Sequence, residues 1–185
     1  TTEHLTLNTY DNAPQKYREF IQEHGKNSSG IGKFSGVLVK GTVGWGRNTT
    51  NDAYWATKGY ISNVNAEITV PSISKLDFYK FNLEHRHFFP IGEKSSLMVM
   101  GKAGYANSYR KTSSLPFFEN YYRGGIGSLR GFESSTLGPK VYDVDNNIIT
   151  YGGNKMVAGS LEFQTPVPLM KDTSNVRISA FVDAG

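Results

Sequence analysis

The sequence predicts an all-β protein, an antiparallel transmembrane β-barrel, on three observations. Polar and apolar residues alternate with a period of two along several segments, aromatic residues are abundant while aliphatic residues are few, and short connectors occur together with very long ones. Hydrophobic residues make up 38% of the chain and aromatic residues 13%, whereas soluble globular domains are about 45–50% apolar. Strands with one apolar and one wet face, bordered by aromatic girdles, are typical of this composition.

The clearest strand is predicted at Tyr79 to Phe89. Its odd positions are aromatic or aliphatic apart from two histidines, and its even positions are mostly charged or polar. Because successive side chains point to opposite faces of a strand, one face is apolar and the other must meet water. The preceding segment, residues 63–70, alternates in the same way, so the two segments form a predicted hairpin.

Weaker alternation predicts the remaining strands. They are expected at 37–45, 96–105, 157–164 and 176–183, with a seventh strand at His4 to Thr9. At roughly 9 to 13 residues, such strands have the length that a tilted crossing of a bilayer requires.

The connectors between these strands are of two kinds. Compact turns marked by Gly or Pro are predicted at 56–59, 90–94 and 166–174, and long loops at 10–33 and 109–153. In a transmembrane barrel the short turns face the periplasm and the long loops face the outside. The chain is therefore expected to be part of one barrel domain over residues 1–185.

One long loop is expected to carry a short surface helix from Pro14 to His24. Apolar or aromatic residues recur at i, i+3, i+4 and i+7 from Tyr17, a proline stands in the first turn, and Gly25 follows as a stop signal. The apolar side of this helix is expected to pack on neighbouring loops.

Composition excludes several functional classes. Lys and Arg total 20 and Asp and Glu 16, and no run of like charge is long enough for a nucleic-acid-binding arm. Cysteine is absent, which excludes disulfides and thiolate metal sites within these residues. No apolar run approaches the roughly 18 residues that a membrane-spanning helix needs. The first residues do not resemble a signal peptide, and the last follow a strand-like pattern, so we expect a piece of a longer protein.

A glycine-rich run at Gly125 to Gly127 invites a phosphate-binding interpretation. That interpretation requires a buried parallel strand before the run and a helix after it, and neither is predicted here; the spacing to Gly131 is also one residue too long for the dinucleotide motif. Ser128 lacks the flanking pattern of a nucleophile elbow. The sequence therefore predicts no catalytic set and no cofactor.

His85 and His87 stand beside Glu84 and raise the possibility of a metal site. Alternation places both histidines on the apolar face of the strand and the carboxylate on the other face, so the three cannot converge without a bulge. An interfacial or lipid-facing histidine pair near the periplasmic rim is the favoured interpretation, and no metal site is predicted.

The loop at 109–153 is much longer than the roughly 12 to 15 residues beyond which structureless loops are usually functional. The aromatic segment 116–122 indicates that it packs on a surface. If the loop folds back into the barrel, Arg130 enters a wet lumen and needs carboxylate partners. Alternation places Glu162 and Asp183 on the lumen faces of the next two strands.

These residues also carry a resemblance. Residues 124–132 (GGIGSLRGF), followed by LGPK at 137–140, resemble the loop-six signature of the BamA family, the outer-membrane β-barrel insertases of Gram-negative bacteria. Leu129 stands where that family usually has valine. Further matching segments lie at 44–47, 58–60, 118–122, 152–154, 160–166 and 181–185, so that the resemblance covers most of residues 34–185.

The resemblance implies strands seven to thirteen of a sixteen-stranded barrel in the bacterial outer membrane. The whole protein would fold and insert other barrel proteins without ATP, using a seam between its first and last strands. Those seam strands and the periplasmic POTRA domains lie outside this sequence. The implied partners are nascent outer-membrane barrel proteins, the lipid bilayer with lipopolysaccharide, and accessory lipoproteins bound through the POTRA domains; nucleic acid is not among them.

The resemblance also implies a loop latch. In the family the arginine of the motif reaches inside the barrel and pairs with acids on strands twelve and thirteen, which here are Glu162 and Asp183. The glycines would let the loop turn back sharply, and the arginine and the aromatic residue after it would pin the loop tip to the inner wall. The expected latch residues are Gly124, Gly125, Leu129, Arg130, Gly131 and Phe132.

Two alternatives belong to other classes. A polypeptide transporter of the two-partner-secretion type would share the loop signature but would conduct a chain through its lumen. A soluble carbohydrate-binding β-sandwich would explain the alternation and the aromatic residues without a membrane, and would be extracted without detergent.

Overall fold

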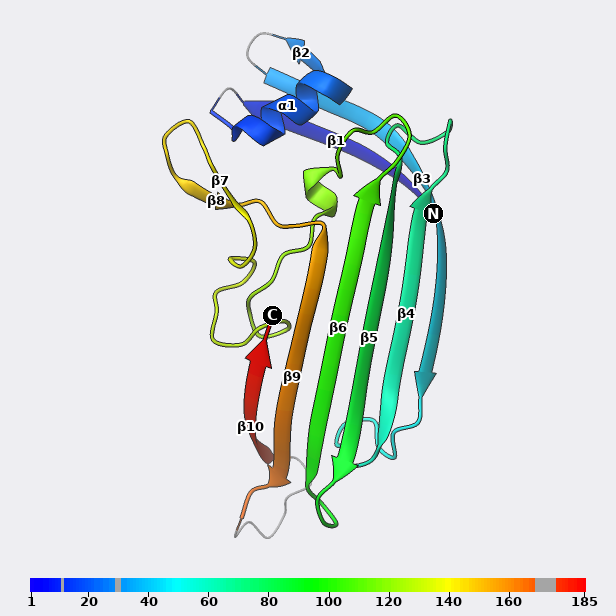
Figure 1. Cartoon of the computed structure of the whole chain (residues 1–185), viewed down its shortest axis with the longest axis vertical. Helices are drawn as coiled ribbons and strands as arrows, with labels where there is room; N and C mark the ends of the chain where they lie inside the picture. The colour runs from blue at the N-terminus through cyan, green and yellow to red at the C-terminus, as the bar shows by residue number, and fades with distance from the viewer. Residues whose placement is uncertain (11, 29–30, 169–175) are drawn as a thin grey trace.

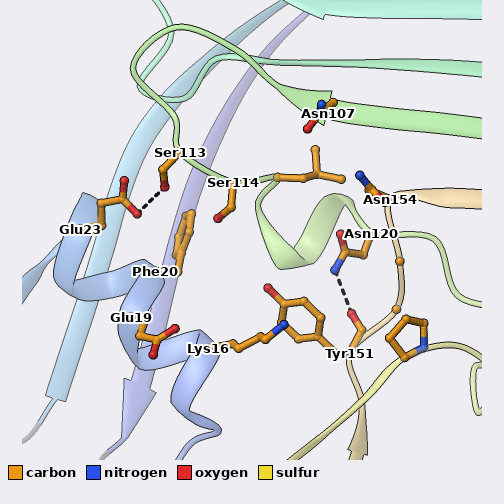
Figure 2. A pocket seen from close by; sticks show the side chains of 14 residues that line it. Lys16, Glu19, Phe20, Glu23, Asn107, Ser113, Ser114, Asn120, Tyr151 and Asn154 are labelled. Atoms are coloured by element: carbon orange, nitrogen blue, oxygen red, sulfur yellow. Dashed lines mark hydrogen bonds between the residues drawn. The ribbon is translucent and has the colours of Figure 1, made fainter.

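Seven long strands form one antiparallel sheet in the computed structural model, which describes residues 1–10, 12–28, 31–168 and 176–185 (Figure 1). Each strand pairs with its neighbours in the order β1-β3-β4-β5-β6-β9-β10. Their bounds are β1 (Thr2–Tyr10), β3 (Ile31–Asn48), β4 (Gly59–Thr69), β5 (Phe78–Pro90), β6 (Ser96–Ser108), β9 (Lys155–Pro166) and β10 (Arg177–Ala184). The predicted antiparallel all-β fold is confirmed, and a sandwich of two packed sheets is wrong.

The strands and connectors differ in places from the prediction. Residues 31–33, predicted as the end of a loop, belong to β3, and β2 (Lys26–Ser28) pairs with them. The connector after β3 covers 49–58, so the compact turn predicted at 56–59 is only its last part. Side chains hold this connector, since Asn51 Oδ1 accepts hydrogen bonds from the amides of Thr57 and Lys58 at 3.0 Å. Much of the predicted turn at 166–174 lies outside the described residues.

The two faces of the sheet differ in polarity. We call the outer face the one that carries the odd positions of β5, and the inner face the one that carries its even positions. The outer face presents exposed apolar side chains along its whole length, among them Val43, Trp45, Ile68, Phe81, Leu83, Phe89, Val99, Val157, Leu161, Ile178 and Val182. The inner face carries ion pairs such as Lys102 to Glu84, with Nζ 3.3 Å from Oε2. The predicted division of the sheet into an apolar face and a polar face is therefore present.

A small apolar core lies at one end of the sheet, which we call the loop end. Helix α1 (Gln15–His24), within the predicted range, places Phe20 and Ile21 against β3, with the rings of Phe20 and Phe34 5.4 Å apart. The remaining members of this core come from β3, the β4–β5 connector, β5, β6 and the long loop: Leu38, Leu76, Phe78, Ala106 and Leu115. No helix in the described ranges is long and apolar enough to cross a bilayer.

The connection from β6 to β9, residues 109–154, is the longest in the structure. It contains the 3₁₀ turn η1 (Phe117–Glu119) and a short hairpin of β7 (Lys140–Tyr142) and β8 (Ile148–Thr150) that the sequence did not predict. In Figure 1 the loop runs down beside the sheet to the level of the chain end at β10 and then returns. Its two legs are joined where Tyr121 and Gly153 exchange backbone hydrogen bonds of 2.7 and 3.0 Å.

Candidate functional site

The side chain of Arg130, at the tip of the long loop, is bonded to the inner face of β9 and β10. Its Nε and Nη2 donate to the two carboxylate oxygens of Asp183 at 2.8 and 2.7 Å, and its Nη1 donates to Glu162 Oε2 at 2.6 Å. The backbone amide of Arg130 adds a fourth bond, to Asp183 Oδ2 at 3.0 Å. The bidentate bond to Asp183 matches the rigid fork of donors that a guanidinium presents. The hydrogen bonds to Asp183 raise the pKa of Arg130 above its ordinary value.

The pairing of β9 with β10 brings the two acids together. Glu162 lies opposite Phe181, and Asp183 lies opposite Ser160, so that the two carboxylates are diagonal neighbours on the inner face, two positions apart in the register. The Ser160 hydroxyl donates to Asp183 Oδ1 at 2.6 Å and accepts from Arg130 Nη2 at 2.9 Å. Asp183 is only 4% exposed, so its charge depends on these donors for stabilisation.

Glycines with positive φ angles shape the backbone on both sides of Arg130. Gly124, Gly125 and Gly131 have φ angles of +109°, +92° and +88°, a region that other residues avoid. At Gly124 a Cβ atom would also lie 2.2 Å from the carbonyl oxygen of Glu133. Turn conformation therefore requires glycine at these three expected positions.

The sequence predicts that Phe132 helps to pin the loop tip to the inner wall. This residue is 53% exposed among the described residues, which form only part of the barrel, so this role stays a prediction. The turn at Gly131, with its positive φ angle, separates the side chains of Arg130 and Phe132. The aromatic ring that contacts Arg130 is that of Phe181, on β10. The centre of this ring lies 3.5 Å from Arg130 Cζ, which is a cation–π geometry. Alternation along β10 could have identified Phe181, because it shares the inner face with Asp183.

Leu129, which precedes the arginine, is buried. Its Cδ1 would lie 2.9 Å from a Cβ atom placed on Gly185, so the glycine after β10 leaves room for it. The apolar side chain thus seats the loop tip beside the end of β10.

A second group of charges on the long loop was not predicted. Glu119, in η1, accepts hydrogen bonds from Lys40 Nζ at 3.1 Å and from Lys80 Nζ at 3.0 Å. Lys40 Nζ lies 3.0 Å from Glu3 and 3.5 Å from Glu67 as well. Both lysines occupy polar positions of the alternation pattern, and this pattern is the signal in the sequence that could have indicated an inward-facing charge group.

The histidines of β5 take part in polar and stacking contacts. His85 Nδ1 and Ser62 Oγ are 2.7 Å apart, and His87 stacks on Phe89 with ring centroids 4.3 Å apart. Among the described residues no group of three His, Asp or Glu side chains could hold a metal ion.

Residues 1–185 match the Omp85 superfamily domain. The chain belongs to the Omp85 superfamily. It is 51% identical over 183 residues to the outer membrane protein assembly factor BamA of Neisseria meningitidis serogroup B, a match that covers 99% of this chain and 23% of the relative. The structure of BamA from Haemophilus ducreyi lacking POTRA domains 1–3 superimposes with a TM-score of 0.86 at 28% identity, over 98% of this chain and 36% of that one.

This Omp85 chain is thus part of an integral barrel of the outer membrane, as the sequence predicted, and it spans about a quarter of the length of the curated relative. In such a barrel the outer face meets lipid and the inner face meets the lumen. The described strands form an open wall with β1 and β10 at its edges.

The two faces predict losses of stability of different size when a charge is placed at neighbouring positions of β6. In the full-length protein, Val99→Lys places an ammonium group on the lipid face and is expected to cost about 2–4 kcal/mol of stability if the site lies near the bilayer midplane. Met100→Lys, one residue further on, places the same group in the wet lumen and is expected to cost much less. Urea unfolding in lipid vesicles measures both, and equal losses would contradict the assignment of the faces.

The two acids are expected to differ in importance for the loop. Asp183→Asn removes the charge that receives three bonds from Arg130, whereas Glu162→Gln removes the charge that receives one. Asp183→Asn is therefore expected to destabilise the docked loop by about 2–3 kcal/mol and Glu162→Gln by roughly half as much. Protease protection of residues 109–153 checks the order, and a larger effect of Glu162→Gln would reverse it.

Proposed function

We propose that this chain supplies the wall and the loop latch of an insertase that folds barrel proteins into the outer membrane without ATP. The observation that carries the proposal is the Arg130 network, which fixes the family's loop motif to two neighbouring strands. The similarity to BamA, named as an outer membrane protein assembly factor, supports the same activity. The transporter alternative shares the motif but receives no support from these relatives.

Such an insertase makes and breaks no covalent bonds and acts by lowering the barrier to folding of its substrate. A nascent barrel strand in lipid has unpaired backbone groups that cost several kcal/mol each, and the closed barrel has none. Insertion therefore lowers the free energy of the substrate, and the insertase needs only to lower the activation barrier. Here the long loop, held at Arg130, would keep the lumen side of β9 and β10 in one arrangement while the seam, formed by strands outside this chain, opens to substrate.

The expected partners follow from this proposal. Nascent outer-membrane barrel proteins would be the substrates, and the outer face would contact the bilayer and lipopolysaccharide. Accessory lipoproteins would bind through periplasmic POTRA domains, which are not part of these 185 residues. The end of the sheet opposite the loop end, which carries the 91–95 connector between β5 and β6, would then face the periplasm. Loop 109–153 would fold into the lumen from outside.

Reconstitution tests the proposal. The full-length protein in lipid vesicles is expected to speed the folding of an added, urea-unfolded barrel protein well above the rate in empty vesicles, with no nucleotide present. The change Arg130→Lys keeps the charge but loses the fork of donors and is expected to slow this folding. A wild-type protein that leaves folding unchanged, or that transports an unfolded polypeptide across the vesicle wall, would overturn the proposal.

A further inference from the structure

Glu119 joins the long loop to the opposite part of the wall from Arg130. Its carboxylate is 12% exposed and is held between Lys40 Nζ, on β3, and Lys80 Nζ, on β5, at 3.1 and 3.0 Å. Lys40 is only 6% exposed and also contacts Glu3 on β1 and Glu67 on β4. One loop carboxylate therefore takes part in a charge cluster that spans four neighbouring strands.

The two attachment points have opposite polarity. At Arg130 the loop supplies the cation and β9 and β10 supply the anions, whereas at Glu119 the loop supplies the anion and the wall supplies the cations. Between the two groups of strands lies β6. Neither attachment can be exchanged for the other, because each would meet like charges at the wrong site.

Packing around Glu119 also holds the loop to this part of the wall. Phe117 and Phe118, next to Glu119, pack against the apolar core at the loop end, and the Tyr121 hydroxyl donates to Asn82 Oδ1 on β5 at 2.9 Å. Lys80 Nζ lies 5.1 Å from the centre of the Tyr121 ring. The descending leg of the loop is thus held to β5 over several residues before it reaches the tip.

We propose that Glu119 is a second anchor of the loop, and that the loop acts as a strut that ties β1, β3, β4 and β5 to β9 and β10 and so fixes the curvature of the wall. This inference rests on the proposed function only in giving the strut a purpose. Removal of the Glu119 charge leaves Lys40 with two acids but leaves Lys80 with no carboxylate among the ion pairs of the described residues. The loop leg is therefore expected to loosen, and with it the link that fixes the curvature of the wall.

Hydrogen exchange of the full-length protein in lipid discs tests the anchor. Glu119→Gln is expected to speed exchange of the amides at 117–123 by about tenfold or more and to leave those at 125–131 much less affected, whereas Arg130→Lys does the reverse. Glu133→Gln, a change of an exposed carboxylate on the same loop, is the control and is expected to change neither segment. Unchanged exchange at 117–123 in Glu119→Gln would overturn the anchor, because packing alone would then hold the leg.

A distance measurement tests the strut. The 185 residues contain no cysteine, so spin labels can be attached through Val43→Cys in β3 and Val157→Cys in β9. Both positions are exposed on the outer face, and the full-length protein used carries no other cysteines. Glu119→Gln is expected to broaden the distribution of label distances, Glu119→Asp to restore most of it, and Glu133→Gln to leave it unchanged. A distribution that stays narrow in Glu119→Gln would overturn the strut, whatever the outcome of the insertion assay.

Discussion

Replacement of Arg130 by alanine in the full-length protein is expected to release the tip of loop 109–153 from β9 and β10, at a cost of about 3–5 kcal/mol to the docked state. Among the described residues the change removes every side-chain donor from Asp183 except Ser160. It leaves Glu162 with the side chains of Gln164, whose Nε2 donates at 3.1 Å, and Ser179. The mostly buried carboxylates of Glu162 on β9 and Asp183 on β10 would then repel each other without a cation between them. Protease digestion of the protein in lipid vesicles measures the release as new cleavage within the loop.

The matched control is Lys140→Ala, which removes an exposed cation from the same loop. It is expected to leave the cleavage pattern unchanged. Full protection of the loop in Arg130→Ala, together with wild-type insertion activity, would show that the network does not hold the tip. Cleavage in both variants would show instead that any loss of positive charge loosens the loop.

Alternation of polar and apolar residues was sufficient to predict the sheet and both of its faces. The side-chain period of two leaves no choice of face once one residue of a strand is placed, so the sequence alone assigns Glu162 and Asp183 to the lumen face. The motif placed Arg130 opposite them. The structure brings these three residues together with the expected chemistry.

The pattern could not predict what depends on loop conformation. Whether Phe132 faces the wall depends on the turn at Gly131, and a glycine with φ near +90° has no counterpart in a periodic pattern. The pairing of Glu119 with Lys40 and Lys80 joins residues 79 and 39 positions apart. Such a pairing follows from how far the loop descends along the sheet, which the length of the loop does not determine.

Gly124→Ala is the substitution expected to disturb the loop most without a change of charge. The φ angle of +109° is costly for any residue with a Cβ atom, by roughly 1–3 kcal/mol. The added carbon would also lie 2.2 Å from the Glu133 carbonyl oxygen, so the backbone on one side of the turn must move. Because Arg130 lies within this turn, movement here shifts the guanidinium away from two acids that it contacts at 2.6 to 2.8 Å.

Gly127→Ala provides the control in the same run of glycines. Gly127 has no positive φ angle, and a Cβ atom there would meet nothing within 4 Å, so alanine at this position is expected to be neutral or slightly stabilising. Protease protection of the loop and insertion rates in vesicles should separate the two variants, with a loss in Gly124→Ala alone. Equal behaviour of both variants would mean that the loop tip adapts its backbone freely, and a latch built on a fixed turn would then be wrong.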